Sequence, residues 1–517
     1  MTEPAIIDAP TTVPAGTTIL DACSDPELFG QWFRRPQTWR AWLAFLAVLF
    51  GLPVMPDQAA LVEQCTGRNE LPFKAFGEAW LICGRRAGKS FVLALVAVYL
   101  ATFRSYAQYL APGERATISI IATDKRQARV IYRYVRGLIS GTPLLSPLLQ
   151  GEPTMAGLDL ANGVTIEIST ASFRTSRGYT FAAVLADEAA FWATDDAAEP
   201  DFAVLDAVRP GLSTIPGAML LVASSPYAKR GALWSAFKDF YGRNDPDVLV
   251  WKAATRVMNP TVSQGVIDRA IERDPASAAA EFGAEFRNDL EAFLDRELIE
   301  ACVDRGVLVR PPIPNVRYVA FVDPSGGRGD AFTLAIGHKD DDRAVLDCLV
   351  ERKPPFDPIA VSRDMSEVIK SYRLRECTGD RYSAEFVVSA FAAAGVRYIH
   401  SQLDRSAIYG EALGIFTSGR ARLVDNARLV SQLAALERKT TATRDRIDHA
   451  PGQHDDLANA SCGALALAAA KPRVVTSGTS IIICGSGNAR NIPGSDVFVG
   501  EARQRVWDRM LRDAAPT

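Results

Sequence analysis

The chain has 517 residues, 48% of them hydrophobic and 23% charged, and this length predicts about two to four domains with sizeable cores. Such a composition excludes wholesale disorder, a collagen-like repeat and a small disulfide scaffold. The 57 Lys and Arg residues nearly balance 60 Asp and Glu residues, for a net charge of −3. This balance argues against a surface that binds nucleic acid everywhere and leaves room for local basic grooves.

Several features indicate a cytoplasmic protein. No apolar run reaches the roughly 18–20 residues of a membrane span, and residues 2–8 lack the basic start and unbroken apolar run of a signal peptide. The eight cysteines are scattered without a CxxC pair, so we expect reduced core thiols. Only four histidines are present, which argues against a histidine-built zinc site.

In chain order, residues 1–49 predict an N-terminal arm, rich in Pro, Thr and Ala over residues 1–20, followed by packed helices. Residues 78–226 alternate short apolar runs with helix-length segments, as is typical of a largely parallel α/β sheet. The strands are expected at 79–83, 117–122, 164–168, 182–185 and 218–223. Residues 227–310 are expected to be helical and end before a proline cluster at 311–314 that predicts a domain linker.

A second α/β pattern follows the prolines. Its first strands are expected at 318–322, 332–337 and 344–350, and its helices at 383–394 and 457–470. The predicted division is therefore 1–49, 50–310 and 311–472, with residues 473–517 as a C-terminal tail of unknown role.

A glycine-rich segment lies between the first expected strand and an apolar helix at 91–100. Glycine turns at a helix N-terminus direct backbone N–H groups at phosphate oxygens, and the helix adds positive potential. We expect Lys89 to reach the β- and γ-phosphates of a nucleotide and the Ser90 hydroxyl to bind Mg²⁺. The usual GxxxxGK[ST] spacing places its first glycine where Cys83 stands, so a chance glycine-rich helix start is the alternative. The residues of the segment are Gly84, Arg85, Arg86, Ala87, Gly88, Lys89 and Ser90.

Another apolar strand ends in two adjacent carboxylates, Asp187 and Glu188. Asp187 is placed to hold Mg²⁺, and Glu188 to polarise the water that attacks the γ-phosphate. An acidic pair after a strand is common on surfaces, but its combination with Lys89 and Ser90 predicts an ATPase.

Three weaker candidates accompany these residues. Ser224 and Ser225 end the next strand, where hydroxyl groups can bond the γ-phosphate or the attacking water, although a plain strand exit explains them nearly as well. Arg177, just before the acidic strand, is the candidate cation for the transition state. A surface salt bridge is the alternative for this arginine, as it is for Arg85 and Arg86.

Dispersed aspartates mark the second α/β region. Asp323 ends its first strand, Asp380 follows a short segment, and Asp455 and Asp456 open the last helix. Each alone is more often a cap or a turn residue, but three separated carboxylates at element ends suit Mg²⁺ or Mn²⁺. Two such ions about 3.5–4 Å apart can activate water and stabilise the leaving oxygen of a phosphodiester.

Residues 419–446 are rich in arginine. Beside a carboxylate–metal site such a segment could hold the phosphate backbone of a duplex. Interleaved acidic residues make a solvated helix face an equal alternative. The cations are Arg420, Arg422, Arg428, Arg438, Lys439, Arg444 and Arg446.

Together these motifs resemble the large terminase subunit of tailed bacteriophages, the motor that packages DNA. The resemblance covers roughly residues 50–470 and includes the family's order of ATPase, proline-marked linker and carboxylate nuclease. It rests on residues 84–90, 185–188, 224–226, 323–327, 380–382 and 454–460. The family's phosphate loop is off register too, so Cys83 agrees with it.

The resemblance implies an α/β fold: a P-loop ATPase domain of the additional-strand type, followed by a ribonuclease H-like nuclease domain. It implies ATP hydrolysis with Mg²⁺, coupled to translocation of double-stranded DNA through the portal into a procapsid. It also implies cutting of concatemeric DNA by two Mg²⁺ or Mn²⁺ ions. The implied partners are double-stranded DNA, the portal protein, the small terminase subunit and further copies in a ring on the procapsid, with a monomer as the isolated form. The implied location is the cytoplasm of the bacterial host, with transient docking on the portal and no membrane partner.

The family's site residues fall on particular positions of this sequence. In the ATPase these are Lys89 and Ser90 for phosphates and Mg²⁺, Asp187 for the metal, Glu188 for water, Ser224 and Ser225 for coupling, and Arg177 as a candidate arginine finger. In the nuclease they are Asp323, Asp380 and Asp456 as catalytic metal ligands, with Asp455 as an alternative or additional ligand. The glutamine that contacts adenine is left open between Gln58 and Gln64.

Two other classes of protein compete with this interpretation. A helicase-like ATPase–nuclease of DNA repair or defence is the first, but residues 188–310 show no run of further helicase motifs. The second is an assembly protein with vestigial sites. Intact Lys89, Glu188 and Asp323 argue against it, because a decayed site loses such residues first.

Overall fold

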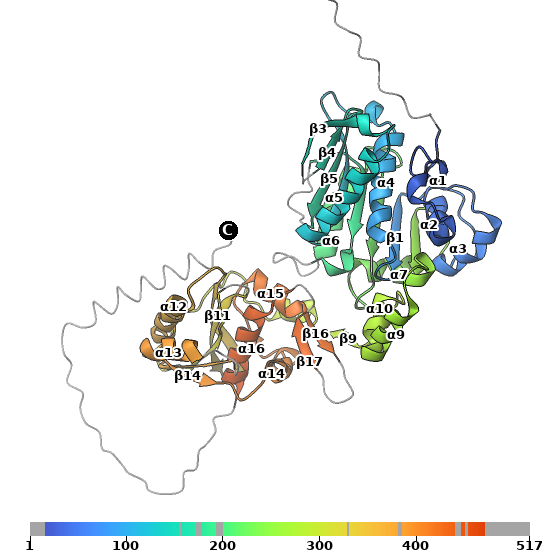
Figure 1. Ribbon diagram of the computed structural model, residues 1–517. Helices are drawn as coiled ribbons and strands as arrows, with labels where there is room; N and C mark the ends of the chain where they lie inside the picture. Colours follow the sequence, from blue (N-terminus) through green and yellow to red (C-terminus); the bar gives the residue numbers. More distant parts are fainter. Residues whose placement is uncertain are drawn as a thin grey trace, which may run out of the picture. The chain divides into compact units, whose positions relative to one another are not determined.

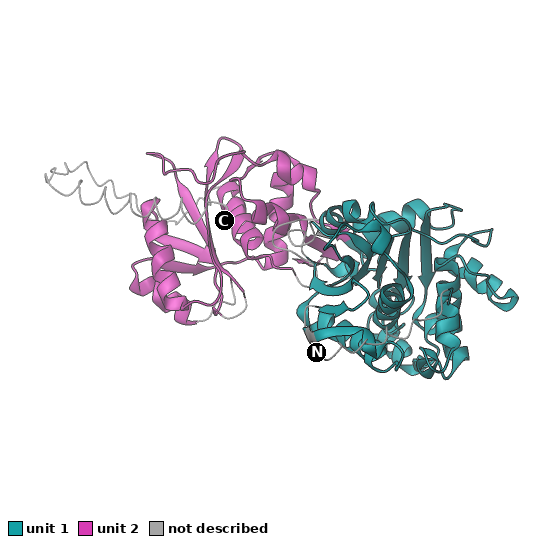
Figure 2. Cartoon of the chain, turned by 90° about the horizontal axis from the view of Figure 1, so that it is seen from above, with its two compact units in different colours: residues 1–290 teal, residues 291–517 magenta. Residues whose placement is uncertain are grey.

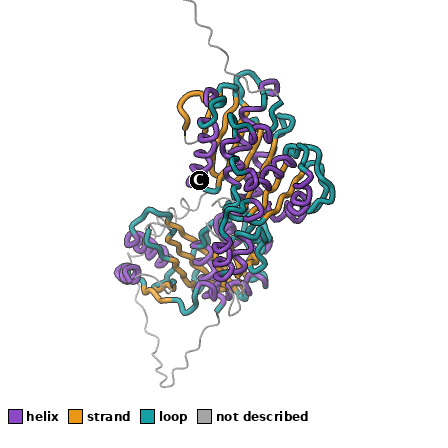
Figure 3. The backbone as a smooth tube through the Cα atoms, turned by 45° about the vertical axis from the view of Figure 1, so that its right-hand side comes forward, coloured by secondary structure: helices purple, strands orange, loops and turns teal. Residues whose placement is uncertain are grey.

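The computed structural model describes residues 16–154, 157–171, 178–192, 200–327, 330–380, 385–439, 446–449 and 453–470. The chain forms two compact units, Met1–Leu290 and Glu291–Thr517 (Figure 2). Both contain helices and strands (Figure 3), so the predicted α/β class is confirmed. The finer predicted division at residues 49, 310 and 472 stays a prediction.

One mixed sheet organises the first unit (Figure 1). Within the described residues it has eight strands in the order β3-β4-β5-β2-β6-β7-β1-β8. They are β1 (Glu78–Cys83), β2 (Ala116–Ala122), β3 (Leu149–Thr154), β4 (Gly157–Leu160), β5 (Val164–Thr170), β6 (Phe181–Asp187), β7 (Met219–Ser224) and β8 (Val248–Ala253). Neighbours from β5 to β8 pair in parallel, and β3 and β4 form an antiparallel edge. Because β7 lies between β1 and β6, the expected additional strand between the phosphate-loop strand and the acidic strand is present.

Sequence patterns located most of this sheet. The strands expected at 79–83, 117–122, 164–168, 182–185 and 218–223 are confirmed as β1, β2, β5, β6 and β7. The expectation that residues 227–310 are wholly helical is wrong, because β8 pairs with β1 there. Its Leu249, Val250 and Trp251 are fully or almost fully buried, and such a short apolar run fits a buried strand as well as a helix.

Helices cover both faces of the sheet. They are α1 (Ile19–Ser24), α2 (Pro36–Leu49), α3 (Ala59–Thr66), α4 (Lys89–Phe103), α5 (Lys125–Ser140), α6 (Pro200–Val208), α7 (Gly231–Phe240), α8 (Thr255–Met258), α9 (Gln264–Arg273) and α10 (Pro275–Glu281). Alternate residues of β1 pack on opposite faces: Leu81 joins the cluster that contains α4, and Ile82 joins the one that contains α7. This alternation is the two-residue period of a strand buried on both faces.

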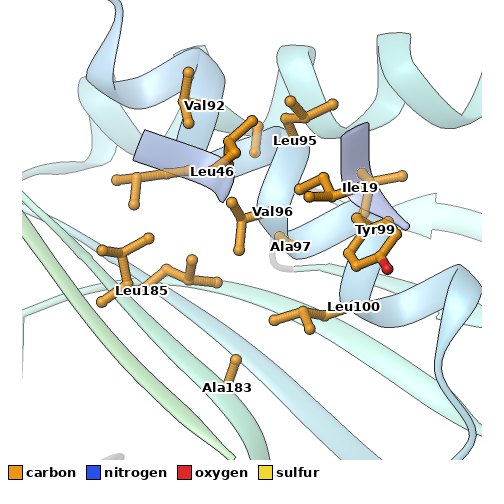
Figure 4. Packing of buried hydrophobic residues seen from close by; sticks show 14 of the residues in the cluster. Ile19, Leu46, Val92, Leu95, Val96, Ala97, Tyr99, Leu100, Ala183 and Leu185 are labelled. Atoms are coloured by element: carbon orange, nitrogen blue, oxygen red, sulfur yellow. The ribbon is translucent and has the colours of Figure 1, made fainter. Parts of the chain in front are cut away.

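Helix α4 is the centre of the larger core. It is apolar on all sides, as expected of a helix with no solvent-exposed face. Figure 4 shows its Val96 between Leu46 of α2 and Leu185 of β6. Helix α1 packs on the same cluster and begins at Ile19 behind a capping box formed by Thr18 and Asp21, so the expected arm is shorter than 20 residues. The core thereby fixes the start of α4, where the phosphate loop ends.

A second mixed sheet organises the other unit. Within the described residues its order is β14-β13-β10-β11-β12-β15, and a small second sheet has the order β17-β16-β9. The strands are β9 (Leu290–Ala292), β10 (Tyr318–Asp323), β11 (Phe332–Asp340), β12 (Arg343–Arg352), β13 (Glu376–Gly379), β14 (Arg397–His400), β15 (Ala421–Arg422), β16 (Leu436–Lys439) and β17 (Arg446–His449). β10, β11 and β12 form an antiparallel meander, and β13 and then β14 add in parallel beside β10. The strands expected at 318–322, 332–337 and 344–350 are confirmed as β10, β11 and β12.

Helices pack on this second sheet. They are α11 (Arg296–Ala301), α12 (Pro358–Ser371), α13 (Glu385–Ala393), α14 (Arg405–Thr417), α15 (Ala427–Ala434) and α16 (Asp456–Ala469). Helix α16, expected at 457–470, lies so close to β10 that a side chain at Gly463 would collide with the Phe321 ring. This close approach sets the start of α16 beside the end of β10.

The described cysteines are core thiols, as expected. All are free and buried: Cys23, Cys65, Cys83, Cys302, Cys348, Cys377 and Cys462. Among the helices of the described ranges, none combines the length and the apolar character needed to cross a bilayer. The predicted tail at 473–517 lies outside the described residues.

Candidate functional site

The glycine-rich segment forms the loop between β1 and α4. Gly88 has φ +107°, a left-handed conformation that glycine adopts without strain, immediately before the first residue of α4. A side chain at Gly84 would collide with the Thr255 hydroxyl and crowd the Phe282 carbonyl. Glycine is thus required at both ends of the loop, by backbone conformation at one and by close packing at the other.

Side chains from outside the loop hold its backbone. They donate hydrogen bonds to the carbonyl oxygens of three consecutive loop residues. The pairs are Trp42 Nε1 to Ala87 O (2.9 Å), Thr255 Oγ1 to Arg85 O (2.8 Å) and Asn259 Nδ2 to Arg86 O (2.9 Å). These three bonds fix the backbone of the loop from outside it.

Lys89 carries a buried ammonium group at the ends of three strands. Its Nζ donates to the Cys83 carbonyl at 3.0 Å and to Ser225 Oγ at 2.9 Å. It also lies 3.2 Å from Glu188 Oε1. The Lys89 side chain is only 4% exposed, and burying its charge is costly unless an opposite charge lies nearby. The Glu188 carboxylate is that opposite charge.

Asp187 faces Ser90 across the sheet edge. Its Oδ2 accepts hydrogen bonds from Ser90 Oγ at 2.8 Å and from Gln127 Nε2 at 2.8 Å, while Gln127 Nε2 also lies 3.1 Å from Ser90 Oγ. Burial and the neighbouring Glu188 raise the pKa of Asp187 above its ordinary value. Its Oδ1 is buried and has no hydrogen-bond partner. A desolvated carboxylate with one unbonded oxygen beside a serine hydroxyl fits Mg²⁺.

The end of β7 orients Glu188. Its Oε2 accepts from the Ser225 backbone N–H at 2.9 Å and from Ser224 Oγ at 3.2 Å. Glu188 itself has φ 52°, an unusual conformation for this residue type that accompanies the sharp exit from β6. Both predicted serines thus contact the predicted catalytic glutamate, and Ser225 contacts Lys89 as well.

The remaining predicted ATPase residues are the arginines and the two glutamines. Arg85 and Arg86 are exposed, and Arg85 forms an ion pair of 3.2 Å with Glu281. Arg177 lies outside the described residues. Neither Gln58 nor Gln64 bonds the loop through its side chain within the described part of the chain, so the adenine-contacting residue stays open.

The sequence reasoning missed Gln127. It lies at the third position of α5, whose start is capped by the Asp124 side chain. The pattern Asp-x-x-Gln after the apolar run of β2 is a helix-start signal and would have placed Gln127 in the first turn of a helix, but not beside Asp187.

In the second unit Asp323 ends β10 in a buried position. Its Oδ2 accepts a hydrogen bond of 2.8 Å from Asn459 Nδ2. Burial raises the pKa of Asp323 to about 8, with Asp456 adding to the shift and the Asn459 hydrogen bond opposing it. Asn459 Oδ1 is buried without a hydrogen-bond partner. Asn459 is the missed residue here, although its spacing of three from Asp456 on α16 places the two on one helix face.

Asp456 opens α16 next to the β10–β11 connection. Its Oδ2 accepts a hydrogen bond of 3.2 Å from the Ala331 N–H. Burial raises its pKa to about 6, and Asp455 and Asp330 add to the shift. Desolvated carboxylates whose acidic neighbours raise their affinity for protons also favour a divalent cation.

Asp380 follows β13 at the same sheet edge. Val322 of β10 pairs in parallel with Gly379, the last residue of β13. Asp323 and Asp380 each follow one member of this pair, so they lie at the same end of neighbouring strands. Within the described residues, no three His, Cys, Asp or Glu side chains are grouped as a metal centre. The fold therefore brings Asp323, Asp380 and Asp456 to one region without closing them around a common point.

Asp455 and Asp456 are adjacent but bond different partners. The Asp455 carboxylate lies 3.2 Å from Arg405 Nη1 and accepts a hydrogen bond of 2.7 Å from the Tyr409 hydroxyl. Both partners belong to α14. This engagement favours Asp456 over Asp455 as the metal ligand.

Three cations of the arginine-rich segment form ion pairs within the described residues. Its described ion pairs are Arg422 with Asp304, Arg428 with Glu351 and Arg446 with Asp448. Between the two alternatives drawn from the sequence, these contacts favour a paired protein surface over a phosphate-binding one.

The first unit therefore has a glycine-rich loop beside buried charged side chains, and the second has buried carboxylates near one sheet edge. No protein-family model matches the sequence, and no curated protein matches it. Solved structures do match. The large terminase of bacteriophage HK97 is 17% identical, and the match covers 80% of this chain and 95% of that one with a TM-score of 0.36.

Two further solved structures illustrate the range of the matches. A large terminase from a thermophilic bacteriophage, in complex with ADP, is 12% identical over 81% of this chain and 96% of its own, with a TM-score of 0.33. The large terminase nuclease of the thermophilic phage G20c is 16% identical over 33% of this chain and 94% of its own, with a TM-score of 0.28.

Proposed function

We propose that the first unit hydrolyses ATP with Mg²⁺ and that the second cuts DNA with Mg²⁺ or Mn²⁺. The chain is then a DNA-packaging motor subunit that drives double-stranded DNA through a portal into a procapsid and cuts concatemeric DNA. One observation carries the proposal: the loop lysine, the strand-end aspartate and glutamate and both serines meet at one sheet edge, as ATP hydrolysis requires.

Each ATPase residue has one role. Lys89 binds the β- and γ-phosphates. When it does so, its ammonium group gives up the hydrogen bond to the Cys83 carbonyl and donates to phosphate oxygens instead. Ser90 and Asp187 hold Mg²⁺, which neutralises the phosphate charge when bound. Glu188 accepts the proton of the attacking water.

The serine pair suits a coupling role. Ser224 and Ser225 bond the Glu188 carboxylate, and Ser225 also bonds Lys89. A change at the γ-phosphate that moves Lys89 therefore reaches Glu188 and the end of β7 through Ser225, whose hydroxyl bonds Lys89 and whose backbone N–H bonds Glu188.

The nuclease residues fit a metal-dependent reaction. Asp323, Asp380 and Asp456 would hold two ions that activate water and stabilise the leaving oxygen of the DNA strand. The raised pKa values of Asp323 and Asp456 and the unbonded Asn459 Oδ1 support a cation between them. Asp455, held by Arg405 and Tyr409, positions the start of α16.

Partners follow from this function. We propose double-stranded DNA, the portal protein, the small terminase subunit and a ring of further copies on the procapsid, in the bacterial cytoplasm. Arg177 remains the candidate arginine finger of such a ring.

Paired variants of the full chain test the two activities. Lys89→Ala should lose phosphate release and keep plasmid cleavage, whereas Asp323→Ala should lose cleavage and keep phosphate release. Exposed Lys238 and Asp340, each changed to Ala, serve as matched controls. Loss of both activities in either variant would contradict two independent sites, and an inactive wild-type chain would refute the proposal.

A second assay distinguishes a packaging motor from a helicase. With portal-bearing procapsids and ATP, a packaging motor protects duplex DNA from added nuclease. A helicase instead separates the strands of a forked duplex. Strand separation without protection would favour the helicase-like alternative.

A further inference from the structure

Helix α5 presents an unbroken basic face. Its cations are Lys125, Arg126, Arg129, Arg133 and Arg136, and its sequence contains no acidic residue. Arg129, Arg133 and Arg136 are spaced by four and three residues, so they lie on one side over successive turns. All three are at least partly exposed, and none forms an ion pair with any residue that the structure describes.

The same face is hollowed. A cavity of about 440 Å³ is lined by Arg129, Tyr132, Arg133, Arg136, Gly137 and Ser140. A side chain at Gly137 would meet no atom within 4 Å, so the space above it is open. The arginines thus border a concave surface whose floor includes small residues.

The chemistry of this face fits phosphate groups. Guanidinium groups bind phosphate oxygens through two parallel hydrogen bonds, and arginine loses less freedom than lysine for each bond formed. Arg129 and Arg136 are seven positions apart, a rise of about 10 Å along the helix, which is about three phosphate steps of one DNA strand. The arginines of residues 419–446 differ, because carboxylates already hold Arg422, Arg428 and Arg446.

The opposite side of α5 reaches the ATPase site. Gln127 lies two residues before Arg129 and donates to Asp187 and Ser90, at 2.8 and 3.1 Å. Ile131 and Val135 bury the helix against the unit's core. A ligand on the arginine face therefore binds the helix that also bonds both proposed Mg²⁺ ligands.

We infer that Arg129, Arg133 and Arg136 bind the phosphate backbone of duplex DNA and that α5 transmits this binding to Ser90 and Asp187 through Gln127. This inference rests on the proposed function, which supplies the duplex as substrate. Duplex binding favours the position of α5 in which Gln127 bonds Asp187, so DNA increases the rate of ATP hydrolysis.

Duplex affinity tests the binding surface. The variant with Arg129, Arg133 and Arg136 all changed to Gln is compared with a control that loses the same charge elsewhere, at exposed Arg34, Arg269 and Arg273. Fluorescence anisotropy with a labelled duplex is measured from 50 to 200 mM salt. We expect at least a tenfold loss of affinity in the α5 variant, with the slope of log K against log salt reduced by about 2.7, and a much smaller change in the control.

The outcomes separate the two proposals. A wild-type chain that binds DNA and hydrolyses ATP, with an α5 variant of wild-type affinity and slope, would overturn the inference alone. The inference would also be overturned if the wild-type chain bound poly-glutamate through these arginines and did not bind the duplex. A wild-type chain without DNA binding and ATPase activity would overturn the proposed function instead.

Gln127→Leu tests the transmission. Leucine keeps most of the side-chain volume and removes the donor to Ser90 and Asp187. We expect duplex affinity within about twofold of wild type, because the arginines are unchanged. The ratio of ATPase rates with and without duplex should fall towards one. A wild-type ratio in this variant would show that α5 does not transmit DNA binding through Gln127.

Discussion

Asp323→Asn should stabilise the second unit while abolishing DNA cleavage. The buried carboxylate of Asp323 has a pKa of about 8 against an ordinary value of 3.8. Asparagine has nearly the same shape, can still accept the hydrogen bond from Asn459 Nδ2, and offers an amide donor beside the unbonded Asn459 Oδ1. The substitution therefore removes a desolvated acid and leaves the packing in place.

The magnitude follows from proton linkage. Between pH 3.8 and 8 the folded chain keeps the Asp323 proton and the unfolded chain has lost it, so wild-type stability falls as the pH rises. The slope is about 1.4 kcal/mol per pH unit and levels off near pH 8. Wild type should lose about 2 kcal/mol relative to Asp323→Asn between pH 6 and pH 8.

Hydrogen exchange measures this difference locally. The free energy of opening is obtained for β10 and β11 amides at several pH values in EDTA, after correction for intrinsic exchange rates. The gap between the variant and wild type should widen from pH 6 to pH 8. Asp340→Asn, at an exposed position, is the control. A gap that does not change with pH would refute the assignment of Asp323 as a buried acid with a raised pKa.

Further predictions concern both sites. Glu188→Gln should bind ATP with wild-type affinity and release no phosphate above background; wild-type turnover would remove its role as the base. Trp42→Phe leaves the Ala87 carbonyl without its buried donor and should lower the urea unfolding free energy by about 1–3 kcal/mol and raise KM for ATP. An unchanged KM would show that the loop does not need this bond. Asp455→Asn should weaken the contact with Arg405 and slow plasmid cleavage. A titration with Mn²⁺ should still show binding to this variant. Loss of Mn²⁺ binding would show instead that Asp455 is a metal ligand. EDTA should stop cleavage, and added Mn²⁺ should restore it.

Sequence patterns predicted those elements whose conformation is determined by residues close to one another in the sequence. Strand β1, the glycine loop and α4 follow one another directly, so the phosphate loop could be recognised before the fold was known. Strand β8 could not be recognised in this way. Its six residues are too few for a period to distinguish strand from helix, and its pairing with β1 decides its conformation.

Contacts between distant residues explain what the sequence left open. Gln127 is 37 residues from Ser90 and 60 from Asp187, and only the order β2-β6 in the sheet brings it to them. Likewise, Arg428 meets Glu351 across 77 residues, and no local pattern reveals that this arginine is already paired.

The adjacent acids of α16 show the same limit. Asp455 and Asp456 are equivalent as a sequence pattern. The side chains of Arg405 and Tyr409 on α14 separate their roles, because both bond Asp455.

Crystals of the full chain with a non-hydrolysable ATP analogue and Mn²⁺ test the central claim most directly. Anomalous scattering should locate Mn²⁺ beside Ser90 and Asp187 in the first unit, and beside Asp323 and Asp456 in the second. The contrary result would be no Mn²⁺ beside either pair of residues and an ATP analogue bound away from the loop of residues 84–90. This result would contradict the assignment of an ATPase and a metal-dependent nuclease to this chain.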